Sequence, residues 1–158
     1  MLQTTSTLAF KFKDGIIVAA DTSVTYGSLA ATKLNRIFCI NNTLITFNGF
    51  VGDFLQVKKD LEQEIANDKS PIDAKGIFKF LQLVLYGARS KTEPKFCSIV
   101  VAGIGKANTN LGESGNPNMF LGTINSKGVF WEDTSVATGF ASHFALPLFR
   151  ATNLEEMN

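Results

Sequence analysis

The first twenty residues carry the pattern that most restricts how this chain can fold, because they describe a β-hairpin. Large apolar side chains alternate with other residues across residues 6–13, which is the two-residue period of a strand. Asp14-Gly15 then supply the turn, since both residue types tolerate the positive φ angles of a tight hairpin. Residues 16–20 are apolar and form the expected return strand. The chain should therefore open with two antiparallel strands.

A second hairpin is expected shortly afterwards. A polar loop around Gly27 leads to residues 36–47, which contain two apolar runs separated by Asn41-Asn42. Asparagine is common at turn positions, so this pattern predicts a third and a fourth strand joined by a tight turn.

Two amphipathic helices are expected in the middle of the chain. In the first, Asp53 can act as the N-cap, and apolar residues recur at helical spacing up to Ile65. The second should begin with Ser70 as its N-cap and Pro71 in the first turn, and it runs towards Arg89. Its apolar residues cover a wide arc, which predicts burial against both a sheet and another helix.

The last third of the chain again passes from strands to a helix. Residues 96–102 form a buried strand, residues 120–124 pair with residues 128–131, and residues 138–151 form a third helix. Residues 105–118 are rich in Asn, Gly and Ser and indicate a surface insertion. Strands, two helices, strands and a helix, with no repeat or linker, predict one α+β domain over the whole chain rather than βαβ units.

The composition limits the classes of partner. The chain has 158 residues, 45% of them hydrophobic, and a net charge of +1, which is typical of one soluble domain. A near-neutral charge provides no basic face for nucleic acid, and no apolar run approaches the ~20 residues that cross a bilayer. We therefore expect neither nucleic acid nor a membrane as a partner. Cys39 and Cys97 sit in apolar runs and are expected to be reduced and buried, as in a cytosolic protein.

Two isolated motifs give no support to a cofactor or a metal. Gly103-Ile104-Gly105-Lys106 follows a strand but lacks the Lys-Ser/Thr pair and the helix of a phosphate-binding loop, so a turn is the better interpretation. His143 is the chain's one histidine and has no second ligand one helical turn away. It is interpreted as an ordinary hydrogen-bonded helix histidine, and no cofactor or metal is expected.

Three residues from separate segments are more informative together. Thr5 opens the first predicted strand, Asp21 ends the second and Arg36 begins the third, so all three should meet at one end of the paired hairpins. Each has an ordinary interpretation alone: strand propensity for the threonine, a turn for the aspartate and a solvated cation for the arginine. Their order along the chain is what indicates a site.

The segments around these residues resemble a proteasome beta subunit, from a family of N-terminal nucleophile hydrolases. Several of the matching segments lie in loops, where a shared fold does not dictate sequence, so the resemblance is specific, and it favours one non-catalytic member of the family. The matching segments include residues 5–12, residues 15–21, Tyr26-Gly27-Ser28, Asn35-Arg36-Ile37, Asp53-Phe54, Arg89-Ser90-Lys91, Phe120-Leu121-Gly122 and Ala137-Thr138-Gly139.

This resemblance implies a four-layer αββα sandwich and a specific chemistry. In active members the nucleophile is the hydroxyl of an N-terminal threonine, and its own α-amine, with a pKa of roughly 8, is the base. Thr5 matches that threonine, but residues 1–4 precede it, so its nitrogen is an amide without basicity. Active members expose the threonine by cleavage after a glycine, and here Thr4 stands at that position.

Other matching positions also depart from the active pattern. The catalytic lysine of the family falls on Arg36, whose guanidinium stays protonated and cannot tune the nucleophile as a lysine does. The resemblance matches Asp21 to the catalytic aspartate, Gly49 to the glycine of the oxyanion hole, and Thr138 to a serine of active members. No catalytic residue is therefore expected, and these five positions, Thr5 included, are interpreted as a vestigial site.

The resemblance implies a structural role in a large assembly. The expected partners are neighbouring beta subunits in a heteroheptameric ring, alpha-ring subunits and the opposing beta ring, in the cytoplasm and the nucleus. Family members continue beyond the third helix with a further helix and two strands. Either the sequence is a fragment of a longer subunit, which we favour, or neighbouring subunits cover the surfaces that those elements would cover. Two alternatives stay open: an active threonine protease processed to start at Thr5, and a binding module that uses residues 105–118 as its recognition loop.

Overall fold

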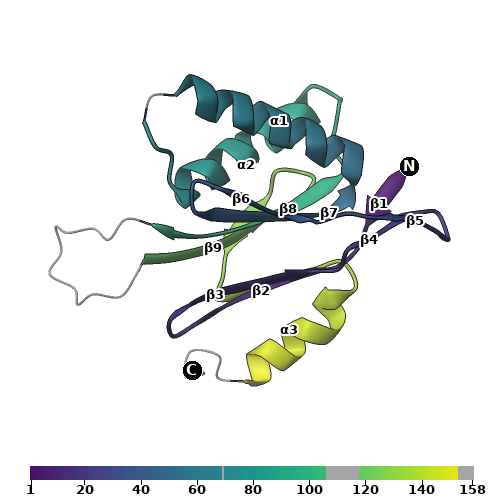
Figure 1. Cartoon of the computed structure of the whole chain (residues 1–158), viewed down its shortest axis with the longest axis vertical. Helices are drawn as coiled ribbons and strands as arrows, with labels where there is room; N and C mark the ends of the chain where they lie inside the picture. Colours follow the sequence, from purple (N-terminus) through teal and green to yellow (C-terminus); the bar gives the residue numbers. More distant parts are fainter. Residues whose placement is uncertain (69, 106–117, 153–158) are drawn as a thin grey trace, which may run out of the picture.

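Two antiparallel sheets lie face to face, with helices on the outer side of each (Figure 1). Helices α1 (Val51–Asn67) and α2 (Ala74–Ser90) cover the larger sheet, and α3 (Ala141–Ala151) covers the smaller one. The layers are therefore helix, sheet, sheet and helix, which confirms the predicted αββα arrangement. The structure is a computed structural model, and the residues it describes are 1–68, 70–105 and 118–152.

The larger sheet has eight strands in the order β10-β9-β8-β7-β1-β4-β5, with β6 beside β7. Every pair of neighbours in it is antiparallel. Its strands are β1 (Leu2–Thr4), β4 (Ser23–Tyr26), β5 (Leu29–Lys33), β6 (Ile37–Ile40), β7 (Thr43–Phe50), β8 (Cys97–Gly105), β9 (Asn118–Ile124) and β10 (Phe130–Glu132).

The smaller sheet contains the hairpin that the first twenty residues predict. Its strands are β11 (Ser135–Thr138), β2 (Thr7–Phe12) and β3 (Gly15–Ala20), in that order. The second predicted hairpin is also confirmed: β6 pairs with β7, and both turn residues, Asn41 and Asn42, have positive φ angles of 48° and 59°.

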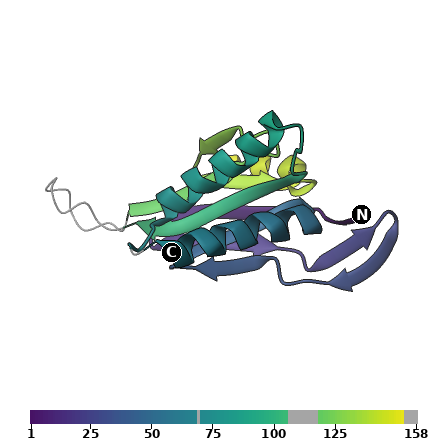
Figure 2. The ribbon, with the colours of Figure 1, turned by 90° about the horizontal axis from the view of Figure 1, so that it is seen from above.

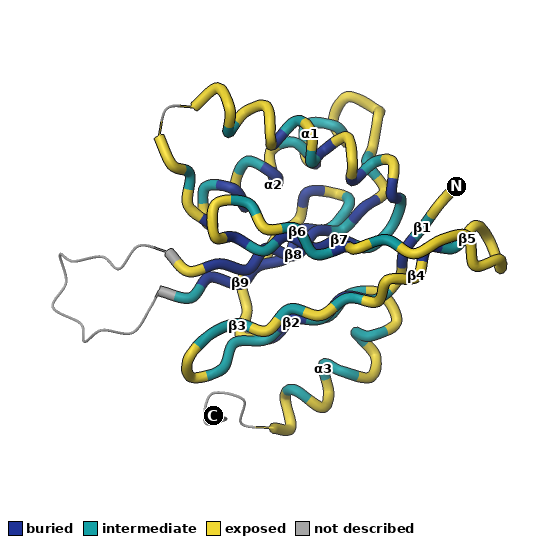
Figure 3. Tube along the Cα trace, in the orientation of Figure 1, coloured by how far each residue is buried: buried dark blue, intermediate teal, exposed yellow. Residues whose placement is uncertain are grey.

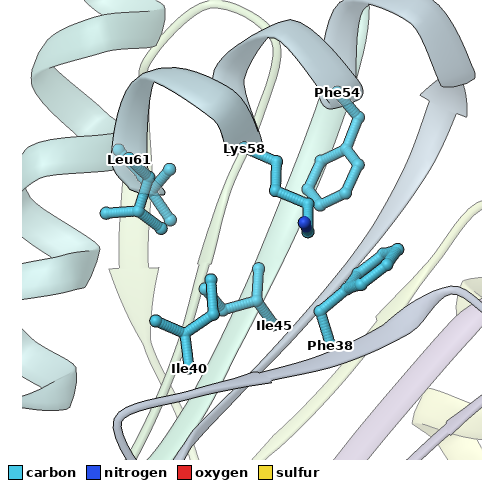
Figure 4. Close-up of a pocket in the computed structure, with 7 residues that line it drawn as sticks. Phe38, Ile40, Ile45, Phe54, Lys58 and Leu61 are labelled. Atoms are coloured by element: carbon cyan, nitrogen blue, oxygen red, sulfur yellow. The ribbon is translucent and has the colours of Figure 1, made fainter. Parts of the chain in front are cut away.

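The main core lies between the larger sheet and the two helices above it. The rings of Phe47 in β7 and Phe54 in α1 stack with their centroids 3.8 Å apart. Buried residues concentrate in the larger sheet and on the helix faces that meet it (Figure 3). At the edge of this core, Lys58 reaches over Phe38 with its Nζ 5.1 Å from the ring centroid, beside a hollow lined otherwise by apolar side chains (Figure 4). The wide apolar arc of α2 is explained by its packing on β8, β9 and α1.

Four strands lie where the sequence did not predict them. The prediction that Thr5 opens the first strand is wrong, because β1 precedes it and pairs with β4 on one side and β7 on the other. The polar loop expected around Gly27 is the β4–β5 hairpin. All five residues of β5 are exposed. No face of this strand has to be apolar, so its sequence does not show the alternation of apolar and polar residues that predicts a strand. Thr138, the first residue of the third predicted helix, is the last residue of strand β11, which pairs with β2.

The first and third helices begin at other residues than predicted. Helix α1 starts at Val51, and the Asp53 carboxylate does not cap it but accepts a hydrogen bond from the Phe96 backbone N–H at 2.7 Å. Helix α3 starts at Ala141, because pairing with β2 extends strand β11 to Thr138. In both cases a contact distant in sequence overrides the local signal.

The predicted start of the second helix at Ser70-Pro71 is also wrong. Helix α2 begins at Ala74, and its N-cap is Asp73, whose carboxylate accepts a hydrogen bond from the Gly76 backbone N–H at 2.8 Å. Two candidate caps lie three residues apart, and the later one is used.

Two smaller predictions have mixed outcomes. Cys97 is buried as predicted, but Cys39 in β6 is exposed, so the prediction of a buried Cys39 is wrong. The insertion predicted at residues 105–118 falls on residues 106–117, which lie outside the described residues. No helix among the described residues has both the length and the apolar character needed to cross a membrane.

Candidate active site

Arg36 lies immediately before β6 and connects the parts of the site. Its side chain has no exposed surface, and its guanidinium donates hydrogen bonds to the Asp21 carboxylate through Nη1 and to the Ser6 carbonyl through Nη2, the latter at 2.7 Å. The guanidinium carbon lies 5.8 Å from the centroid of the Phe47 ring. Asp21 follows β3 of the smaller sheet and Phe47 belongs to the larger one, so one side chain joins the two sheets.

The charge of Arg36 is balanced at the boundary between core and solvent. Burial lowers the pKa of Arg36 from its ordinary value, and the charge and hydrogen bond of Asp21 act against that shift. The Asp21 side chain is 40% exposed, so water reaches the carboxylate although the guanidinium is enclosed. The Nε atom of Arg36 is buried and has no hydrogen-bond partner among the described residues. The position of the Arg36 guanidinium is therefore fixed, because both of its terminal nitrogens donate hydrogen bonds to protein acceptors.

Thr5 is exposed and lines an open pocket of about 400 Å³. Asn48 of β7 lines the same pocket, as do residues at the start of α3, so segments distant in sequence form it. Asp21 and Arg36 do not line the pocket, and Arg36 approaches Thr5 through the carbonyl of its neighbour Ser6. The residues around the pocket are Thr4, Thr5, Asn48, Gly139, Phe140 and His143.

The nitrogen of Thr5 is the amide of its peptide bond with Thr4. Thr4 is only 5% exposed, and its hydroxyl donates a hydrogen bond to the Gly49 carbonyl at 3.3 Å. The preceding strand is paired on both edges, and its register pairs are Leu2↔Tyr26, Gln3↔Thr25, Gln3↔Phe50 and Thr4↔Gly49. The segment before Thr5 is thus part of the larger sheet.

Two glycines allow backbone segments to approach closely at this site. Gly139 has a φ of +63°, and a Cβ there would lie 2.3 Å from the Thr5 carbonyl oxygen. Gly49 has a φ of +108°, and a Cβ there would lie 2.3 Å from the Phe96 carbonyl oxygen. Both positions require glycine on steric grounds. Residues with a Cβ atom rarely adopt these positive φ angles, and a Cβ atom would clash with the backbone here.

Thr138 pairs with Thr7 rather than with Thr5. Their hydroxyl oxygens are 2.5 Å apart, and the two residues are directly opposite each other in β11 and β2. This hydrogen bond occupies the Thr138 hydroxyl within the smaller sheet.

The structure therefore brings some of the predicted site residues together and separates others. Arg36 contacts both Asp21 and the Ser6 carbonyl next to Thr5, whereas Gly49 contacts Thr4 and Thr138 contacts Thr7. Among the residues that the structure describes, no group of three or more His, Cys, Asp or Glu could hold a metal ion.

Sequence reasoning missed several residues of the pocket. His143, interpreted as an ordinary helix histidine, lines it together with Asn48 and Phe140. The resembling segment Ala137-Thr138-Gly139 ends just before these helix residues, and that proximity was the available signal. No local pattern indicated Asn48, which reaches the pocket from β7.

Comparisons with known proteins agree on one family. The profile of the family described as "Proteasome subunit" matches residues 1–158. Proteasome subunit beta type-4 of Xenopus laevis is 35% identical over 157 residues, and that of Drosophila melanogaster is 33% identical over 153 residues. Proteasome subunit beta type-7 of Saccharomyces cerevisiae is 34% identical over 157 residues.

These matches cover most of this chain but only part of each relative. They include 95% of the chain for the Xenopus protein and 92% for the other two. The chain spans 61% of the Xenopus relative, 54% of the Drosophila relative and 56% of the yeast relative.

Proposed function

The chain belongs to the proteasome beta subunit family, and we propose that it is a non-catalytic member that fills one position in the beta ring of a core particle. The family contains threonine proteases, so the particle would degrade proteins through other subunits. This chain would contribute to the wall of the proteolytic chamber and to the assembly of the ring. The proposal rests on the Thr5 nitrogen, which is the amide of a peptide bond and not a free amine.

Strand β1 supports the absence of catalysis. The amine base of a threonine protease requires a free N-terminal threonine. Thr5 is acylated by Thr4, which is buried and bonded to Gly49, and β1 has partner strands on both edges. Cleavage before Thr5 would remove a strand from within the larger sheet and leave β4–β5 without its connection to β7. Retention of the segment is therefore favoured by folding itself.

Arg36 supports the same conclusion. A lysine at this position could lose or share a proton with a nearby hydroxyl, whereas a guanidinium remains charged. Its two terminal nitrogens are directed at Asp21 and at the Ser6 carbonyl. The side chain thus has a structural function in place of a chemical one.

The position and the partners follow from the same family membership. The relatives named beta type-4 and beta type-7 favour the seventh beta position of a eukaryotic ring. The partners would be the neighbouring beta subunits, subunits of the alpha ring and the opposing beta ring, in the cytoplasm and the nucleus. No cofactor, metal, nucleic acid or membrane has a part in this function.

Isolation of native core particles tests the proposal. The chain should be present in a fixed stoichiometry with the other subunits, and its intact mass should include residues before Thr5. Thr5→Ala should leave the peptidase activity of the particle unchanged and cost at most about 1 kcal/mol of stability. Recovery of the chain only as a free monomer would contradict the structural role, and a mature chain that begins at Thr5 would contradict the inactive site.

An active threonine protease is the second candidate, favoured by the exposure of Thr5 at an open pocket. It requires cleavage between Thr4 and Thr5, which N-terminal sequencing detects. Arg36→Lys alone should not produce activity, because the Thr5 nitrogen would still be an amide. Self-processing in a particle that carries both Arg36→Lys and Thr4→Gly would show that only these positions separate the site from an active one.

A further inference from the structure

We propose that strand β1 is a latch, which holds the β4–β5 hairpin on the larger sheet and releases it when the strand is displaced or removed. The inference goes beyond the proposed function, because it concerns the folded chain itself, whether or not Thr5 is catalytic. It rests on three observations: the place of β1 in the sheet, the small part of the hairpin that reaches the core, and the separate attachment of the base of the hairpin.

Strand β1 connects the hairpin to the rest of the larger sheet. Among the described strands, β4 pairs only with β5 and β1, and β1 lies between β4 and β7. Gln3 is opposite Thr25 on one edge of β1 and opposite Phe50 on the other. The Thr25 hydroxyl also donates a hydrogen bond to the Gln3 carbonyl at 3.4 Å. The hairpin therefore reaches β7 only through a strand of three residues.

The hairpin itself contributes little to the core. Among residues 23–33, all of which the structure describes, Val24 alone is buried, and it belongs to the main core cluster. All five residues of β5 are exposed, and Figure 2 shows the hairpin extending past the helices. A ribbon of two strands is marginally stable in water by itself, and segments with few buried contacts open at low free energy. The hairpin therefore depends on β1 to stay on the sheet.

The base of the hairpin is attached independently of β1. The Leu34 backbone N–H, just after β5, donates a hydrogen bond to the Thr22 carbonyl, just before β4, at 2.9 Å. One residue further out on each side of the base, the side chains of Asp21 and Arg36 form their ion pair after Asn35. Leu34 also packs against the main core cluster. Loss of β1 would thus leave the base in place and free the rest of the hairpin, so residues 21–22 and 34–36 are the hinge.

The latch makes the position of the hairpin depend on the covalent bond between Thr4 and Thr5. While that bond is intact, β1 is tethered beside β7, and the Thr4 hydroxyl is bonded to the Gly49 carbonyl at 3.3 Å. A detached strand of three residues would have to offset the loss of its translational freedom on binding. The chain thus has a docked and a released arrangement of the hairpin, and attachment of residues 2–4 selects the docked one.

Hydrogen exchange of the full-length protein, measured by mass spectrometry, tests the latch. Gln3→Pro removes a backbone donor from within β1, whereas the matched control Gln3→Ala removes the side chain and keeps the donor. In Gln3→Pro the amides of residues 23–33 should exchange at least about tenfold faster than in the unmodified protein, while those of β8 keep their protection. In Gln3→Ala both segments should exchange as they do in the unmodified protein.

A gentler variant keeps the test decisive if Gln3→Pro does not fold. Gln3→Gly keeps the backbone donor but weakens the strand, so it should speed exchange of residues 23–33 by a smaller factor. Unchanged exchange of these residues in folded Gln3→Pro, or in Gln3→Gly where the proline variant does not fold, would overturn the latch. Equal loss of protection in β8 would also overturn it, because β1 would then stabilise the whole sheet. Each of these outcomes leaves the proposed function standing, since that function is tested by incorporation into the particle and by the mass of the mature chain.

Discussion

Arg36 holds two sheets with one guanidinium group, and this geometry sets the cost of replacing it. Arg36→Lys keeps the charge but offers a compact ammonium, which cannot satisfy both the Asp21 carboxylate and the Ser6 carbonyl in the same fork geometry. One of these two partly buried hydrogen bonds would be lost. We expect the free energy of unfolding to fall by about 1–3 kcal/mol, measured by urea denaturation at neutral pH.

Arg89→Lys provides the matched control for that substitution. Arg89 is exposed in the last turn of α2, so the same chemical change there should alter stability by less than about 0.5 kcal/mol. If both variants were equally stable, the contacts of Arg36 would contribute nothing beyond its charge.

The two cysteines should differ strongly in reactivity. Burial raises the pKa of Cys97 from 9.0 to about 12, and the nearby Asp53 carboxylate adds to the shift, while Lys95 opposes it. Cys39 is exposed. At pH 8 a thiol reagent should modify Cys39 at least about a hundredfold faster than Cys97, because the thiolate is the reactive species. Cys39→Ser should remove the fast phase, and a persistent fast phase would contradict the burial of Cys97.

The raised pKa of Cys97 also predicts how the stability of the fold changes with pH. In the unfolded chain Cys97 loses its proton near pH 9, while the folded chain keeps that proton up to about pH 12. The folded state therefore binds more protons in this window, and stability falls as the pH rises through it. Cys97→Ala should flatten this part of the pH profile, whatever its effect on stability at pH 7.

At the scale of elements, the start of α2 offers a direct comparison of two candidate caps. Asp73 accepts the hydrogen bond of the Gly76 N–H, whereas Ser70 lies outside the helix. Asp73→Ala should cost about 1 kcal/mol of stability, and Ser70→Ala should cost much less. Thermal unfolding of the two variants under identical conditions measures the difference, and the reverse order would place the helix start at the earlier signal.

Elements whose apolar residues recur at a regular spacing were predictable from the sequence, whereas the four strands that were missed are short, with three to five residues each. The hairpin β2–β3 and helix α2 each place apolar side chains on one side, so their period appears in the sequence. Strand β5 has no buried residue, and β1 has three residues whose pairing depends on strands far along the chain. Their formation is decided by tertiary contacts, which a local pattern does not contain.

The candidate site could also be predicted only in part from the sequence. The apolar pattern places Asp21 after the second predicted strand and Arg36 at the start of the third, close to where the structure has them, but it does not place Thr5 correctly. The partners that give the site its geometry are the Ser6 carbonyl, and Asn48 and His143 beside Thr5. A backbone carbonyl carries no sequence signal, and the other two reach the site from distant elements. Only the folded arrangement reveals them.

Helix α3, which covers the smaller sheet, is packed on one side and exposed to water on the other. On its inner side Phe149 packs against Phe10 of β2, with ring centroids 5.0 Å apart. On its other side Phe140, Phe144 and Leu148 recur every four residues and are 70%, 77% and 63% exposed. Residues at this spacing form one stripe along a helix, so the chain presents a contiguous apolar surface to water.

This stripe predicts concentration-dependent association of the isolated 158-residue chain. Two chains that bury the stripe against each other remove apolar surface from water at about 25 cal/mol per Å². Phe144→Lys with Leu148→Lys should shift the chain towards monomer in sedimentation velocity over a range of concentrations. The folded structure should keep its stability, because both side chains contribute little to the core. Leu83→Lys, which changes an exposed leucine of α2, should leave association as it was. If it dissociated the chain as well, general surface charge rather than the stripe on α3 would control association.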